Sequence, residues 1–139
     1  MITENASGAV VYQIKDGQPQ YLLLKSATSD FWGFPKGHVE GAETDLETAH
    51  REIQEETQLD VTVDPEFHVV LDYDMQNGHH KHVVLYTAKV ANDVTITRQK
   101  VEISDFGWFL YSEARATLSY ANLQGALDQA HAYLTAGAL

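Results

Sequence analysis

Two short runs of aliphatic, β-branched and aromatic residues stand near the start of the chain. The first covers residues 8–14 and the second residues 21–24, with Lys-Asp-Gly-Gln between them at 15–18. Because Asp-Gly is a strong signal for a tight turn, the pattern predicts a β-hairpin. A polar loop is expected over 26–31, followed by a short extended segment and a turn over 32–40.

The hydrophobic period changes to that of an α-helix between Thr44 and Gln58. Apolar side chains recur at helical spacing at three positions: Leu46, Ala49 and Ile53. Carboxylates at i, i+3 and i+4 share another arc of the same helix: Glu52, Glu55 and Glu56. The pattern predicts an amphipathic helix that packs on a core and presents a carboxylate cluster toward solvent.

Strands dominate the remainder of the chain, with one helix at its end. Strands are predicted over 60–63 and 67–73, on either side of Pro65, then over 81–90 and 106–110. Residues 94–97 alternate briefly. A helical turn is predicted at 111–114 and a longer helix over 121–134. This order of elements predicts an α/β fold in which a mixed sheet lies between helices.

Composition limits the classes of function. The chain has 139 residues, enough for one domain, and a formal net charge of −11. Such acidity argues against nucleic acid or an anionic membrane as a partner. The absence of cysteine excludes disulfides and thiol catalysis. Neither a signal peptide nor an apolar run of about 20 residues is visible, so we expect a cytoplasmic protein. A monomer and a homodimer both remain open.

The three helix glutamates are candidates for a metal site. Like charges at i and i+4 repel, so something positive is expected beside them. Carboxylate oxygens suit Mg²⁺, with Mn²⁺ as an alternative, and Mg²⁺ in proteins is commonly shared with substrate phosphates. A solvated acidic helix face is the competing interpretation. Two neighbours favour the metal: Arg51, four residues before Glu55, and the basic Pro-Lys-Gly turn at 35–37.

The spacing of this region resembles the signature of the Nudix hydrolases. Glu43 follows Gly37 after five residues, and after a further seven residues Arg51 begins the run Arg-Glu-Ile-Gln-Glu-Glu-Thr-Gln-Leu. One position departs from the pattern, because Gln58 stands where the family has glycine. That glycine position is expected to be left-handed, at the end of the helix, and the departure is expected to cost on the order of 1 kcal/mol without loss of the fold.

The flanking residues resemble one branch of the family, the asymmetric diadenosine tetraphosphate hydrolases of the animal and bacterial type. The run Trp-Gly-Phe-Pro-Lys-Gly-His-Val-Glu at 32–40 carries this likeness, together with Glu102 six residues before Trp108. The resemblance implies an α/β/α sandwich of a single domain over 1–139. It also implies magnesium-dependent hydrolysis of a small nucleotide, diadenosine tetraphosphate, to ATP and AMP. Two alternatives remain: cleavage of a nucleoside triphosphate, ADP-ribose, a nucleotide sugar or an RNA 5′ end, or nucleotide sensing without cleavage.

The same resemblance assigns residues to roles. The implied metal ligands are three glutamates and one backbone carbonyl: Glu52, Glu55, Glu56 and Gly37. For Glu52 the role of base is the alternative. Arg51 is expected to steady Glu55, with Glu43 fixing the loop, and Glu102 is the candidate general base or a further metal ligand. Lys36 and Lys81 are expected to bind phosphate, and His38 either to contact the substrate or to support the loop. Tyr73 and Phe106 are expected to lie on either side of an adenine, with a place in the core as the alternative for each.

The remaining histidines have ordinary explanations. Alternation places His80 and His82 on one face of their strand and His79 on the other, which disfavours a zinc site. A solvated loop is the simplest interpretation, and contact of one of them with pyrophosphate is the alternative. We expect His50, on the apolar arc of the helix, to be buried or half-buried and hydrogen-bonded.

Overall fold

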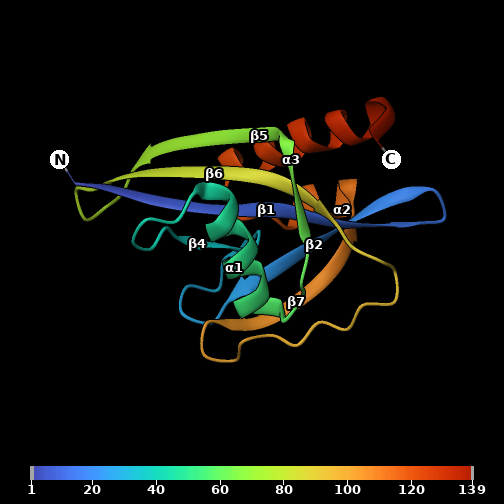
Figure 1. Cartoon of the computed structure of the whole chain (residues 1–139), viewed down its shortest axis with the longest axis horizontal. Coiled ribbons are helices and arrows are strands. Elements are labelled where there is room, and N and C mark those ends of the chain that lie inside the picture. The colour runs from blue at the N-terminus through green and yellow to red at the C-terminus, as the bar shows by residue number, and fades with distance from the viewer. Residues whose placement is uncertain (1, 139) are drawn as a thin grey trace.

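A mixed β-sheet runs through the computed structural model, which describes residues 2–138 (Figure 1). The strand order is β3-β2-β1-β6-β5, with β4 paired to β1 and β7 paired to β2. The long central strand β1 runs parallel to β6 and antiparallel to β2 and β4. The strands are β1 (Thr3–Lys15), β2 (Gln18–Ser26), β3 (Trp32–Gly33), β4 (Lys36–His38), β5 (Thr62–Asp74), β6 (His80–Lys89) and β7 (Ile103–Leu110). The predicted mixed sheet is confirmed.

Two connections show how local sequence sets the strands. Asp16 and Gly17 both have positive φ, 52° and 78°, as a tight hairpin turn requires, so the predicted hairpin is confirmed. The prediction of separate strands around Pro65 is wrong, because β5 continues through it as one strand. Its pairing with β6 shifts register between Asp64 and Val69, since proline has no N–H to give to the ladder. Residues 94–97 form no regular strand.

Helices cover both faces of the sheet (Figure 1). They are α1 (Asp45–Thr57), α2 (Tyr111–Thr117) and α3 (Ala121–Tyr133), and a short π-helical segment, Leu134–Ala138, extends α3. Ile53 of α1 packs with Val11 and Leu22 on one face of the sheet. On the opposite face, Leu127 of α3 packs with Leu23. The α/β/α sandwich is confirmed.

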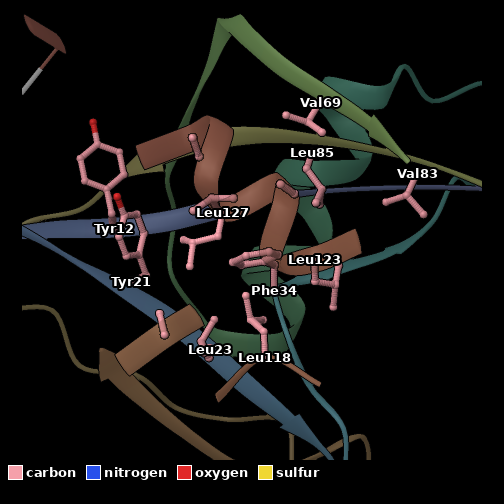
Figure 2. Close-up of a cluster of buried hydrophobic side chains, with 14 of the residues drawn as sticks. Tyr12, Tyr21, Leu23, Phe34, Val69, Val83, Leu85, Leu118, Leu123 and Leu127 are labelled. Carbon is pink, nitrogen blue, oxygen red and sulfur yellow. The ribbon is translucent and has the colours of Figure 1, made fainter. Parts of the chain in front are cut away.

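The larger core cluster lies on the face covered by α2 and α3 (Figure 2). Phe34 belongs to it, although this residue stands between the two short strands that lead to α1. Burial of Phe34 therefore ties the loop before α1 to the α3 side of the sheet. In the described part of the chain, no helix combines the length and the apolar character that crossing a membrane demands.

Candidate active site

Both ends of α1 are fixed, which sets the direction of its glutamates. Thr44 and Glu47 form a capping box, with Glu47 N donating to Thr44 Oγ1 over 3.2 Å and Thr44 N donating to Glu47 Oε1 over 2.9 Å. At the other end Gln58 is left-handed, with φ 60° and ψ 22°, and its N–H donates to Gln54 O over 2.8 Å. The left-handed conformation expected at this position is confirmed.

Glu52 lies directly against the backbone of Gly37. A Cβ atom added to Gly37 would stand 2.1 Å from Cδ of Glu52, so only glycine leaves room for this carboxylate. The Glu52 side chain is 13% exposed. Burial, followed by the charge of Glu55, raises the pKa of Glu52 above its usual range. The structure thus brings Gly37 and Glu52 together, as the predicted metal site requires.

Glu56 is buried, which differs from the solvent-facing position expected for it. Its residue is 7% exposed, and Lys36 N donates to its Oε1 over 3.0 Å. The segment after β6 covers this end of α1, because Gln99 N donates to Glu56 O over 3.1 Å. Burial raises the pKa of Glu56 to about 8, and the nearby charges of Glu52 and Glu102 add to the effect.

Arg51 holds the acidic loop and the helix together. Its Nε and Nη2 bind Oε2 and Oε1 of Glu43 at 2.7 and 3.0 Å, and Nη2 also donates to His38 O over 2.9 Å. Its Nη1 lies 3.1 Å from Oε1 of both Glu52 and Glu55. The predicted contact with Glu55 is confirmed. Hydrogen bonds from Arg51 lower the pKa of Glu43 to about 2.

Glu102 approaches this cluster from another part of the chain. It is exposed and directly precedes β7, and its carbonyl accepts a hydrogen bond of 2.8 Å from Ala27 N. The charge of Glu102 contributes to the raised pKa of both Glu52 and Glu56, which places its carboxylate near theirs. Two separate segments therefore supply the acidic groups.

The acidic cluster suits a hard cation, although it is not a ready-made metal centre. Among residues 2–138, no three carboxylate or imidazole side chains converge closely enough to hold an ion in the present arrangement. Nη1 of Arg51 contacts Glu52 and Glu55, so ion binding would require these two side chains to turn from the guanidinium. Buried carboxylates that repel one another, beside a backbone without Cβ, are oxygen ligands of the kind Mg²⁺ uses.

One of the two lysines predicted to bind phosphate stands beside the carboxylates, and the charge of the other acts on it. Lys36 is the first residue of β4, and burial together with the charge of Lys81 lowers its pKa to about 8. Lys81, the second residue of β6, is half-buried and lies opposite Tyr73 in the β5 and β6 ladder. The structure thus gathers the two predicted phosphate contacts, with Lys36 next to Glu56.

The prediction that Tyr73 and Phe106 lie on either side of one adenine is wrong. Tyr73 packs against the cluster on the α3 face, whereas Phe106 packs against the cluster on the α1 face. Phe106 pairs with Leu24, whose side chain is buried in the core cluster on the α1 face, so the ladder turns Phe106 away from Tyr73. The alternation of side chains along one strand does not show which of them share a face of the sheet with those of another strand.

Tyr120 is the aromatic residue that sequence reasoning missed. Its charge contributes, after burial, to the raised pKa of Tyr73, so the two phenols lie near each other. Tyr120 is 46% exposed and packs edge-on against Phe31, with ring centroids 4.7 Å apart. Its position just before α3 was the available signal, because residues that precede a helix commonly lie in exposed loops.

The histidines follow the predicted alternation. His80 Nε2 and His82 Nδ1 lie 3.0 and 2.8 Å from Oδ1 of Asp72. His79 Nδ1 instead lies 2.6 Å from Oε2 of Glu4, so the division of the three between two faces is confirmed. His38 Nε2 lies 3.0 Å from the other oxygen of Glu4. Glu4 was also missed by sequence reasoning.

His50 behaves as its place on the helix predicts. It is half-buried, and its Nε2 lies 2.7 Å from Oδ1 of Asp60, just beyond the end of α1. The expected hydrogen-bonded histidine is confirmed.

Comparisons with known proteins agree with this geometry. The NUDIX domain model matches residues 4–133. The asymmetrical bis(5'-nucleosyl)-tetraphosphatase of Sus scrofa is 31% identical over 119 residues, which is 83% of this chain and 80% of the relative. The protein of the same name from Caenorhabditis elegans is 30% identical over 135 residues, 93% of this chain and 95% of the relative. A crystal structure of a C. elegans Ap4A hydrolase binary complex superposes with a TM-score of 0.89, at 28% identity over 96% of this chain and 98% of that one.

Proposed function

Because this chain belongs to the Nudix family, we propose that it is a pyrophosphohydrolase whose substrate is a dinucleoside polyphosphate, with diadenosine tetraphosphate giving ATP and AMP. The observation that carries the proposal is the junction between β4 and α1. There the backbone N–H of Lys36 donates to Glu56, and Gly37 lies against Glu52. The charges of Glu56 and Glu52 also act on the ammonium group of Lys36. Cationic groups for a polyphosphate and acidic groups for a metal ion meet there. The similarity to two tetraphosphatases over most of the chain supports the choice of substrate.

The acidic cluster would hold Mg²⁺, or Mn²⁺ in its place. The proposed ligands are the carbonyl of Gly37 and carboxylates on α1 and before β7: Glu52, Glu55, Glu56 and Glu102. When bound, the ion shields phosphate charge and lowers the pKa of a water molecule. The pKa of Glu56 is raised to about 8 in the metal-free protein, so a bound ion would take the place of its proton.

The chain's own residues bind and orient the substrate. Lys36 and Lys81 neutralise the polyphosphate and hold it in line with an attacking water. Arg51 holds the loop of Glu43 against α1, the helix that carries Glu52 and Glu55.

Glu102 has the role of general base in this proposal. Its exposed carboxylate lies near the buried Glu52 and Glu56 and can accept a proton from the attacking water. Unlike Glu55, it has no hydrogen bond from Arg51.

One nucleobase lies on the aromatic residues of the α3 face in this proposal. Tyr73 and Tyr120 are near each other and expose part of their rings, and a base stacked on such rings gains on the order of 1 to 3 kcal/mol. His38 would contact the phosphates from the end of β4. The complete set of carboxylates favours a catalyst over a nucleotide sensor.

The test is product analysis by chromatography after incubation with diadenosine tetraphosphate and Mg²⁺. Parallel reactions contain nucleoside triphosphates, ADP-ribose, a nucleotide sugar or 5′-triphosphorylated RNA. We expect equal amounts of ATP and AMP from the dinucleotide, and a loss of several orders of magnitude in rate for Glu56→Gln, with Glu66→Gln as the control on an exposed residue. Cleavage of only the other substrates would overturn the choice of substrate. Binding of nucleotide without cleavage of any would overturn catalysis.

A further inference from the structure

Glu4 links two segments that reach the site from different elements. It lies near the start of β1, with a side chain 22% exposed, and each of its carboxylate oxygens accepts a hydrogen bond from a histidine. Oε1 lies 3.0 Å from Nε2 of His38, and Oε2 lies 2.6 Å from Nδ1 of His79. We call Glu4, His38 and His79 the histidine bridge.

One arm of the histidine bridge reaches the loop that contains Gly37. His38 is the last residue of β4 and directly follows Gly37, and its carbonyl accepts a hydrogen bond of 2.9 Å from Arg51 Nη2. The position of His38 therefore affects both the backbone that faces Glu52 and the guanidinium that holds Glu55.

The other arm reaches the hairpin of β5 and β6. His79 ends the turn between these strands, where Met75 N donates to His79 O over 2.8 Å. Lys81 follows two residues later and pairs with Tyr73 across the ladder. Because β1 is parallel to β6, with Glu4 opposite Lys81, the bridge lies beside the first residues of β6.

Glu4 and Tyr73 share one face of the sheet. The charge of Glu4 contributes to the raised pKa of Tyr73, and Ala6, two residues along β1, is buried in the same cluster that Tyr73 packs against. Asp72 precedes Tyr73 on the strand and thus points to the opposite face, where it joins His80 and His82.

We infer that Glu4 is a positioning residue for substrate binding. Through the histidine bridge it sets the separation between the Gly37 loop and the pair formed by Lys81 and Tyr73. Loss of Glu4 therefore weakens the binding of the polyphosphate more than it slows the chemical step. This inference rests on the proposed function. A purely structural role would loosen the hairpin without any selective effect on KM.

The test compares Glu4→Leu with Glu4→Gln, His79→Ala and the control Asp72→Leu. Glu4→Leu removes both hydrogen bonds at similar volume, whereas Glu4→Gln keeps one acceptor and gains a donor for the second histidine. His79→Ala cuts one arm and keeps the inference testable if Glu4→Leu fails to fold. Asp72 also bridges two histidines on the same hairpin, but on the other face. The readouts are KM and kcat for diadenosine tetraphosphate, and the Kd of an analogue with methylene groups between its phosphorus atoms.

We expect Glu4→Leu and His79→Ala each to raise KM and Kd about tenfold, with kcat within about threefold of wild type. Combining the two is expected to add little further, because both break the same link, and Glu4→Gln is expected to stay near wild type. The inference would be overturned if KM were unchanged in both Glu4→Leu and His79→Ala, or if KM rose equally in Asp72→Leu. In either case, hydrolysis by the wild-type protein would still uphold the proposed function. If the wild-type protein neither binds the analogue nor cleaves the dinucleotide, the proposed function fails by itself.

Discussion

Arg51 forms a bidentate pair with Glu43, in which Nε lies 2.7 Å from Oε2 and Nη2 lies 3.0 Å from Oε1. The two residues are eight positions apart, Glu43 in the loop before α1 and Arg51 in its second turn. A bidentate guanidinium–carboxylate pair fixes both the distance and the angle between the two side chains, which a single ammonium group does not. The pair therefore sets where the loop lies relative to the glutamates of α1.

We predict that Arg51→Lys lowers kcat by about one to two orders of magnitude, because a lysine cannot keep the contacts with Glu43, Glu55 and the carbonyl of His38 at once. The guanidinium is partly exposed, at 22%, so the loss in free energy of unfolding is expected to be modest, about 1 kcal/mol. Steady-state kinetics and thermal unfolding measure the two effects.

Arg115→Lys is the matched control for this change. Arg115 forms a similar two-sided contact with Asp128, at 3.0 and 3.2 Å, between α2 and α3. We expect that variant to retain wild-type kcat. A normal kcat in Arg51→Lys would show that the bidentate pair does not position the glutamates.

We predict that Glu56 makes the metal-free protein less stable as the pH rises. Its pKa is near 8 in the folded state against about 4.5 unfolded, so the folded state binds the proton more tightly. The resulting stabilisation is fully present below about pH 4.5 and is lost as the pH passes through 8, on the order of a few kcal/mol. Glutamine resembles the protonated form, so metal-free Glu56→Gln should gain stability relative to wild type between pH 5 and pH 8.

Urea unfolding of both proteins in chelator at several pH values measures this difference. The comparison cancels titrating groups that do not interact with Glu56, such as His80, which both proteins share. The pKa of Lys36 depends on the charge of Glu56, so its change is measured together with that of Glu56. Added Mg²⁺ is expected to stabilise wild type more at pH 8 than at pH 6, because the ion competes with the Glu56 proton. A constant difference between the two proteins across the pH range would contradict the raised pKa.

Glu102→Gln tests the general base. Glutamine keeps the size of the side chain and loses the ability to accept a proton, so we expect kcat to fall about 10² to 10⁴-fold with KM nearly unchanged. The acidic limb of the plot of kcat against pH is expected to change as well. A rise in KM for Mg²⁺ with little loss of kcat at saturating metal would instead identify Glu102 as a ligand alone.

The parts of this protein that sequence predicted best are those set by local spacing. The helix of α1 follows from the recurrence of Leu46, Ala49 and Ile53, and the contact of Arg51 with Glu55 follows from one turn of that helix. The hairpin at Asp16 and Gly17 depends only on two residues with positive φ.

The features that sequence did not predict depend on how distant strands pair. Phe106 packs against the core cluster on the α1 face because its strand pairs with β2 in the register that puts it opposite Leu24. Glu4 meets His79, 75 residues away, only because β1 runs parallel to β6. Burial of Glu56 requires the irregular segment after β6 to fold over α1, and the brief alternation at residues 94–97 does not indicate that contact.

Gly37→Ala should separate activity from stability. The new Cβ would meet the end of the Glu52 side chain at 2.1 Å, and a flexible side chain can move away. We expect a loss of kcat of at least about 10²-fold as Glu52 is displaced, with the free energy of unfolding reduced by less than about 1 kcal/mol.

Gly8→Ala, in β1 opposite Lys36, is the complementary control. Its Cβ would stand 2.1 Å from the carbonyl oxygen of Pro35 and 2.6 Å from Cα of Lys36, which are backbone atoms. We expect this variant to lose stability by about 2 kcal/mol or more. If Gly37→Ala retained full activity, the close approach of Glu52 to this loop would not matter for catalysis.

Gln58→Gly is expected to stabilise the protein, because Gln58 ends α1 in the left-handed region at φ 60°. Glycine removes the Cβ strain of about 1 kcal/mol but adds freedom to the unfolded chain, so the net gain is expected to be a few tenths to about 1 kcal/mol. Gln54→Gly, one turn earlier in the exposed face of α1, should instead cost about 1 kcal/mol, because that residue is helical. Urea unfolding compares the three proteins. Destabilisation by both glycines would mean that the Gln58 side chain supplies a favourable contact that outweighs the strain of its backbone.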